Sequence, residues 1–297
     1  MAMPEETSII QKIWRALPFV GGGELVVTVV ELNGVIGGGG PGRKGLTLQR
    51  LEKSIEAAFK PSKLSAVALA INSPGGSPVQ SRLIFNMIRR LAREKDIPVI
   101  AFIEDVGASG GYILAAAGDE IYADESSIVG SIGVISGGFG FTEAIARLGV
   151  ERRVHTAGEN KSTLDPFRPE DPEDVARLKS ILDELHRQFI DLVKERRPGK
   201  LADDEALFSG AFWAATKAKE LGLIDGTAHL GDFLRARYGK DVRIKRISPE
   251  TGSLLKKLLS GSETAAGDGF GSGLSLIDPD RLLEAVERRA LWSRFGL

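Results

Sequence analysis

The chain has 297 residues, which is enough for one large domain or two small ones with a buried core. Its formal net charge is −1 and 27% of its residues are charged, so the composition predicts no nucleic acid or other polyanion as a partner. The chain contains no cysteine, which excludes disulfides, thiol catalysis and cysteine-ligated metals. The sequence contains no other metal or cofactor signal, and we expect neither.

Residues 1–23 form an N-terminal segment with one helical pattern. The sequence has no apolar stretch long enough to span a bilayer and no continuous signal-peptide core, so we expect a cytoplasmic location. Between residues 9 and 20, apolar side chains recur at helical spacing, with Lys12 and Arg15 among them. Two interpretations stay open: a helix in peripheral contact with a membrane surface, or a helix packed on its own domain or a neighbouring subunit.

Strands and helices alternate from residue 24 onward. Apolar, β-branched runs predict strands at 24–32, 67–71, 99–103, 121–123, 131–136 and 152–156. Helical periodicity and capping residues predict helices at 48–59, 78–97, 110–117, 142–148, 172–193 and 208–223. This alternation is typical of an α/β layered fold with a mainly parallel sheet.

The C-terminal part of the chain differs in composition. Residues 247–275 include a stretch rich in glycine, serine and threonine, which predicts a flexible linker. Residues 276–297 contain an amphipathic helical pattern, and we expect this helix to dock on another surface.

Two glycine-rich segments follow two of the predicted strands directly. They are 72–76, Asn-Ser-Pro-Gly-Gly, and 107–111, Gly-Ala-Ser-Gly-Gly. Parallel strands would deliver both segments to the same edge of the sheet. Ser109 would then lie at a strand-to-helix turn, where backbone N–H groups have no partner within the helix. Two such donors can stabilise a tetrahedral oxyanion, so the pattern indicates an acyl-transfer enzyme with Ser109 as nucleophile.

A serine nucleophile needs a base, and the sequence leaves two kinds open. Among the histidines, His186 and His229 are interpreted as surface or structural residues, and His155 is the remaining imidazole for a Ser-His-Asp triad. A lysine shielded from water is the other option. Lys161 stands apart from most lysines of the chain because it lies in a non-helical turn after a predicted strand.

Four segments in register resemble the signal peptide peptidase A (protease IV) family of Ser-Lys peptidases. They are 71–76, 108–112, 129–134 and 158–161, and the resemblance runs over residues 24–240. It implies that Ser109 is the nucleophile and Lys161 the general base. It also implies that Gly76 and Gly110 are the oxyanion-hole donors and that Ser131 holds the lysine ammonium. Residues 24–246 would then be the Ser-Lys peptidase domain.

The resemblance also implies a fold and an assembly. The family has a Clp-protease/crotonase-like fold, and this chain, with one copy of each motif, looks like its short form. That form is a homo-oligomer in which Ser109 of one subunit would meet Lys161 of the next. The expected function is cleavage of small unfolded or remnant signal peptides in an oligomeric chamber. The alternatives are an acyl-CoA hydratase or isomerase on the same fold, and a catalytically silent oligomeric scaffold.

Overall fold

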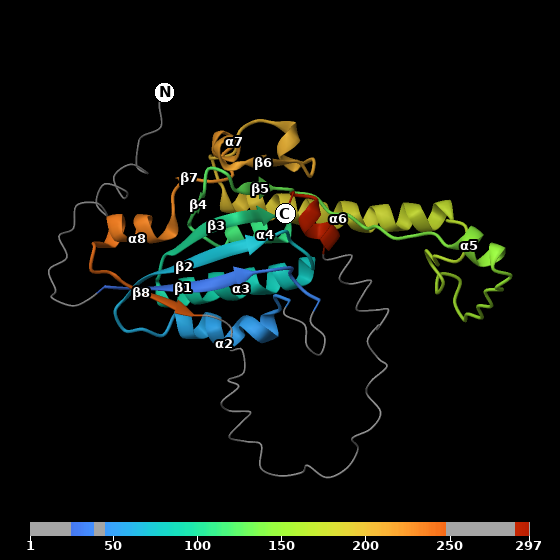
Figure 1. Ribbon diagram of the computed structural model, residues 1–297, viewed down its shortest axis with the longest axis horizontal. Helices are drawn as coiled ribbons and strands as arrows, with labels where there is room; N and C mark the ends of the chain where they lie inside the picture. The colour runs from blue at the N-terminus through green and yellow to red at the C-terminus, as the bar shows by residue number, and fades with distance from the viewer. Residues whose placement is uncertain (1–24, 39–44, 248–288, 297) are drawn as a thin grey trace, which may run out of the picture.

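The computed structural model describes residues 25–38, 45–247 and 289–296 (Figure 1). The predicted N-terminal segment 1–23, almost all of the linker 247–275 and most of the C-terminal segment 276–297 lie outside these residues.

Within the described residues, eight strands form a single sheet. Six of them lie in the order β6-β5-β3-β2-β1-β8, and β4 pairs with both β3 and β7. All neighbours are parallel except β5 and β6, which are antiparallel. The bounds are β1 Val26–Asn33, β2 Leu64–Ser73, β3 Val99–Ala108, β4 Glu120–Ala123, β5 Ile128–Gly130, β6 Phe212–Ala214, β7 Gly226–Thr227 and β8 Arg243–Ile247. The structure therefore confirms the layered α/β fold with a mainly parallel sheet.

Helices cover both faces of this sheet, which explains the apolar runs in its central strands. Residues 66–71 of β2 are completely buried, as expected for a parallel strand that is covered on both sides. Helices α2, α3 and α4 and the C-terminal half of α6 pack on one face, and α8 packs on the other. The helices are α2 Leu48–Ala58, α3 Pro78–Lys95, α4 Gly110–Ala115, α5 Thr142–Arg147, α6 Pro172–Arg196, α7 Ala215–Glu220 and α8 Leu230–Tyr238.

The predicted starts of the helices at residues 78 and 172 are confirmed. The Ser77 hydroxyl accepts a hydrogen bond from the backbone N–H of Gln80, with Pro78 as the first residue of α3. The Asp171 carboxylate accepts one from the N–H of Glu173 at 2.8 Å, with Pro172 as the first residue of α6.

Three predicted elements are wrong. The sequence predicts a strand at residues 131–136, but the observed strand β5 lies before them and ends at Gly130. Gly130 and Ser131 both have positive φ, 115° and 53°, so the chain turns away from the sheet there. Residues 152–156 form no strand within this chain. The helix expected at 208–223 is divided into a 3₁₀ turn, Glu205–Phe208, then β6 and α7, because Gly210 has a φ of 85°.

Helix α6 extends beyond the sheet and carries an exposed appendage at its outer end (Figure 1). We call residues 137–171, which include α5, the arm. Several large apolar side chains of the arm face solvent, with exposed fractions of 67% for Phe139, 78% for Leu148 and 55% for Val150. Apolar surface of this extent usually marks a site of contact with a partner.

The described end of the chain packs against the sheet. Residues 289–293 are helical, and Phe295 is 6% exposed in a cluster with Val106 and Ala108 of β3. Its ring lies 5.0 Å from that of Phe212 on β6. Among the described residues, no helix combines the length and the apolar composition needed to cross a membrane.

A buried ion pair ties the end of α6 to the strands. Arg197, 2% exposed, donates to the Asp225 carboxylate at 2.6 Å and to the carbonyl of Gly222 at 2.8 Å. The same carboxylate accepts from Lys200 at 2.6 Å and from the N–H of Ile121 at 2.8 Å. Burial by itself would raise the pKa of Asp225, but these hydrogen bonds and charges outweigh it and hold the pKa below its usual value.

We expect Asp225→Asn to lower the free energy of unfolding by about 3 kcal/mol, because Arg197 would remain buried without a counter-ion. A depressed carboxyl pKa contributes stability above the pKa of the unfolded state, and that contribution is lost as the pH falls through the folded-state value. The wild type should therefore lose stability below about pH 4, and the variant should lose less over the same range. Denaturant titrations at several pH values measure both effects.

The matched control is Glu220→Gln. Glu220 pairs with Lys217 at 2.9 Å, but this pair lies on the surface, so its removal should leave stability unchanged. Equal losses in the two variants would contradict the role given to the buried pair.

Candidate active site

The two glycine-rich segments meet at one edge of the sheet, as the sequence predicts. They follow the neighbouring strands β2 and β3, and Ser73 is paired with Gly107. A Cβ placed on Gly75 would lie 2.8 Å from the Cβ of Ser109 and 2.9 Å from the backbone nitrogen of Gly110. Gly75 also has a φ of 104°. Only glycine therefore allows this close approach of the two loops.

Ser109 occupies a strained position at the junction of β3 and α4. Its φ is 52° and its ψ is −123°, a conformation that side-chain-bearing residues rarely adopt and that costs about 1–3 kcal/mol. The surrounding hydrogen bonds hold it there. Its N–H donates to the carbonyl of Gly130 at 2.9 Å, and its carbonyl accepts from the N–H of Tyr112 at 2.9 Å. The Ser109 hydroxyl is partly exposed and makes no hydrogen bond within the described residues.

Two backbone N–H groups beside Ser109 have no acceptor among the residues that the structure describes. They belong to Gly76 and Gly110. Gly110 is the first residue of α4, where helical N–H groups have no partner within the helix. Gly76 has a φ of 138°, and a side chain there would overlap the carbonyl oxygen of Ile36. Both residues contribute to the wall of the same cavity as Ser109.

This cavity has a volume of about 320 Å³ and separate elements build its walls. Besides Gly76, Ser109 and Gly110, the lining consists of Pro78, Val79, Arg82 and Leu83 from α3, Ile113 from α4, Gly133, Val134 and Ile135 after β5, and Leu185, Gln188 and Phe189 from α6. The sequence analysis did not identify these walls. The apolar stripe of α6 contains Leu185 and Phe189, but periodicity alone does not show which stripe residues face a cavity.

Ser131 lies next to Ser109 at the end of the neighbouring strand. It is 5% exposed and follows Gly130, whose carbonyl accepts the N–H of Ser109. The N–H of Ser131 itself donates to the carbonyl of Ala211 at 2.7 Å. The loop after Ser131 is held by His186, whose Nε2 lies 3.1 Å from the carbonyl oxygen of Ile132.

Lys161 lies in the arm and does not line this cavity. Its backbone N–H donates to the carbonyl of Gly158 at 3.3 Å. Its side chain is exposed and makes no hydrogen bond or ion pair with any described residue. A single copy of the chain thus brings Ser109, Gly76, Gly110 and Ser131 together and leaves Lys161 apart, in the arm. The arm lies at the outer end of α6 (Figure 1).

None of the three histidines forms a hydrogen bond with the Ser109 hydroxyl within the described residues. His155 is exposed on the arm, and His229 lies 3.5 Å from the Asp124 carboxylate on the surface. The ring of His186 contacts the carbonyl oxygen of Ile132, as described above. None of the three is among the residues that line the cavity.

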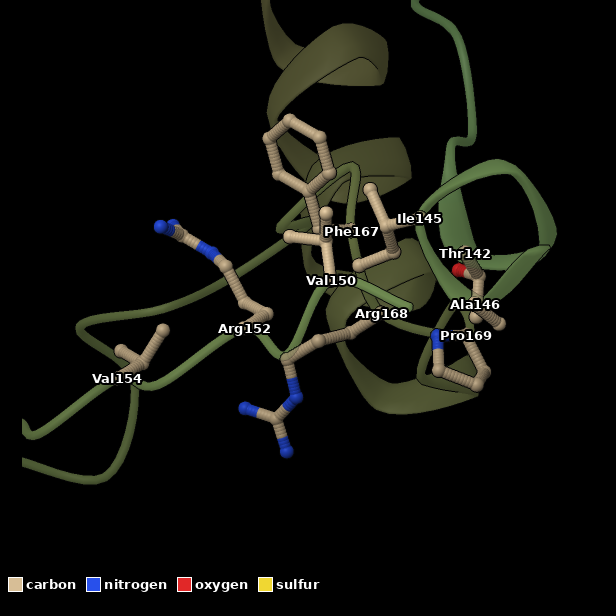
Figure 2. Close-up of a pocket in the computed structure, with 9 residues that line it drawn as sticks. All are labelled: Thr142, Ile145, Ala146, Val150, Arg152, Val154, Phe167, Arg168 and Pro169. Atoms are coloured by element: carbon tan, nitrogen blue, oxygen red, sulfur yellow. The ribbon is translucent and has the colours of Figure 1, made fainter. Parts of the chain in front are cut away.

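A larger hollow of about 430 Å³ lies in the arm, between α5 and residues 150–154 and 167–169 (Figure 2). Arg152 on its rim pairs with Asp165 at 3.3 Å and lies over the ring of Phe167. The N–H of Phe167 and the nearby Arg152 hold the pKa of Asp165 below its usual range. The hollow lies in the arm, away from the edge of the sheet where the two glycine-rich segments meet, so the smaller cavity at Ser109 is the candidate active site.

Comparison with known proteins places these features in a family. The model of peptidase family S49 matches residues 91–242, about half of the chain. The protein named Na(+)/H(+) antiporter NhaA from Brucella abortus is 50% identical over 283 residues, which are 92% of this chain and 37% of that protein. The chloroplastic serine protease SPPA of Arabidopsis thaliana is 31% identical over 64% of this chain and 28% of its own length. The chain therefore spans little more than a third of the length of the Brucella abortus protein.

A solved structure of a membrane-bound stomatin-specific protease also resembles this chain. It has a TM-score of 0.49 and 16% sequence identity, over 77% of this chain and all of that one.

Proposed function

Because this chain belongs to peptidase family S49, we propose that it is a serine endopeptidase with Ser109 as its nucleophile. The observation that carries the proposal is the strained turn at Ser109, which presents a hydroxyl beside two backbone N–H groups, all three without a hydrogen-bond partner among the described residues. Strained backbone of this kind is concentrated at functional sites.

In the proposed reaction, the Ser109 oxygen attacks the scissile carbonyl carbon and its proton passes to a neutral lysine. The N–H groups of Gly76 and Gly110 donate to the oxyanion that forms, and one such donor is worth about 3 kcal/mol of barrier. The protonated lysine then returns the proton to the leaving amine. Water finally hydrolyses the acyl-enzyme by the reverse sequence of proton transfers.

We propose that the base is Lys161 of a neighbouring copy in a homo-oligomer. Its separation from Ser109 within one chain supports this, and so does the exposed apolar surface of the arm that carries it. Docking of the arm on a neighbour would bury Phe139 and Leu148 and remove Lys161 from water. Ser131, beside Ser109, would then be in place to accept a hydrogen bond from the lysine ammonium.

The proposed substrates are short unfolded peptides, including remnants of signal peptides, that enter a chamber enclosed by the oligomer. An apolar cavity of about 320 Å³ next to the nucleophile can hold one large side chain. Folded proteins would be too large to enter such a chamber.

Labelling with a fluorophosphonate probe tests nucleophile and base together. We expect the wild type to be labelled, and the Ser109→Ala and Lys161→Ala variants to remain unlabelled. The control is Ser126→Ala, which removes an exposed hydroxyl near β5 and should not affect labelling. Full labelling of Ser109→Ala, or acyl-CoA turnover without labelling of the wild type, would contradict the proposal.

A further inference from the structure

The cavity beside Ser109 is apolar except for a few groups. Most of its side chains are aliphatic or aromatic, and Ser109 and Gln188 are polar. Among the lining residues, Arg82 is the one with a charged side chain. A peptide in this cavity therefore meets a mainly apolar surface with one positive charge.

Arg82 has no counter-ion among the described residues, unlike Arg89 and Arg90 of the same helix. Arg89 pairs with Asp119 at 2.7 Å, and Arg90 pairs with Glu94 at 3.2 Å. Arg82 is exposed and forms no ion pair or hydrogen bond with any described residue. Its guanidinium is thus available to a ligand.

The other walls do not neutralise this charge. Gln188 of α6 donates to Glu184 at 3.3 Å, which brings that carboxylate near the lining, but Glu184 forms no ion pair with Arg82 in the described structure. Apolar walls strengthen an ion pair, because they exclude water from around it. A guanidinium also matches a carboxylate in shape, since two N–H groups can donate to its two oxygens.

We infer that Arg82 is a specificity residue that selects peptides with a carboxylate close to the residue held in the cavity. This inference rests on the proposed peptidase function and names its substrate class: peptides with an apolar side chain and a nearby negative charge. The carboxylate has two sources, an aspartate or glutamate side chain and the C-terminus of a short peptide.

Two pairs of fluorogenic peptides distinguish these sources. One pair carries glutamate or glutamine next to the apolar residue, and the other carries a free or an amidated C-terminus. We expect the wild type to prefer the carboxylate member of at least one pair by about twofold to tenfold in kcat/KM, the range for partly exposed ion pairs. The preference should shrink as salt is added.

In Arg82→Gln the ratio within that pair should fall to about one, and in Arg82→Glu it should reverse. The matched control is Arg93→Gln, the same change at an exposed residue of α3 that does not line the cavity; its ratio should equal that of the wild type. Because each ratio compares two peptides on one variant, loss of folded protein does not alter it.

The inference is overturned if the wild type shows no preference in either pair, or if Arg82→Gln and Arg93→Gln change the ratio equally. Binding of the same peptides to Ser109→Ala, measured by fluorescence anisotropy, separates this result from failure of the proposed function. A carboxylate preference in binding that disappears in the Ser109→Ala, Arg82→Gln double variant supports the role of Arg82, even if the wild type hydrolyses no peptide.

Discussion

Replacing Ser109 by alanine is expected to lower peptide hydrolysis roughly a thousandfold or more, the usual effect of removing a nucleophile that acts together with a base. The substitution removes one oxygen, which makes no hydrogen bond within the described residues, so no structural contact is lost. The hydrogen bonds that fix the turn come from the backbone and remain. The measurements are kcat/KM on an unfolded fluorogenic peptide, the melting temperature and the mass of the assembly in solution.

Ser126→Ala is again the appropriate control, because it removes a serine hydroxyl from the surface without touching the cavity. It should match the wild type in all three measurements. Substantial turnover by Ser109→Ala at unchanged melting temperature and mass would exclude Ser109 as the nucleophile.

The second large effect is recovery of activity when two inactive variants are mixed. Ser109→Ala retains Lys161, and Lys161→Ala retains Ser109. If each site takes its serine from one subunit and its lysine from the next, random mixing at equal amounts should restore about a quarter of wild-type activity, since both halves must be intact at a shared interface. Subunits would be mixed by dissociation and reassembly, with mixed assemblies verified by mass spectrometry of differently tagged chains.

The control replaces one partner by a double variant. Ser109→Ala mixed with the Ser109→Ala, Lys161→Ala variant contains no nucleophile and should stay inactive. Verified mixed assemblies of the two single variants without activity would mean that Lys161 does not serve a neighbour's Ser109.

Local patterns predicted the central sheet and the loop contact at the candidate site. The β-branched runs around residues 67–71 and 99–103 became β2 and β3, although β3 continues to Ala108 through two exposed acidic residues. Pairing of these strands follows from parallel topology and brings Gly75 against Ser109. Short stretches of sequence therefore suffice to predict these two strands and the contact between the two glycine-rich segments.

Other features depend on contacts that short stretches do not encode. The segment 131–136 resembles a strand in composition, but Val134 and Ile135 lie along the cavity and Ile132 is buried in the core beneath it. Residues 152–156 also look like a strand, but they pair with no strand in the described part of the chain. The walls formed by Leu185 and Phe189 come from a helix more than seventy residues after Ser109, and only the folded chain shows which elements meet there.

The parallel pairing of β1 with β8 has a consequence for how the molecule is made. Val26 is paired with Arg243, and Arg246 forms an ion pair with Glu31 at 3.1 Å, so the two ends of the described domain meet in one sheet. During synthesis, β1 emerges first and one of its edges stays without a partner until residues 243–247 follow. An open edge can pair with another chain, and contacts between distant residues form slowly. A nascent chain stopped before β8 is therefore expected to aggregate, even though it already contains Ser109, Lys161 and both glycine-rich loops.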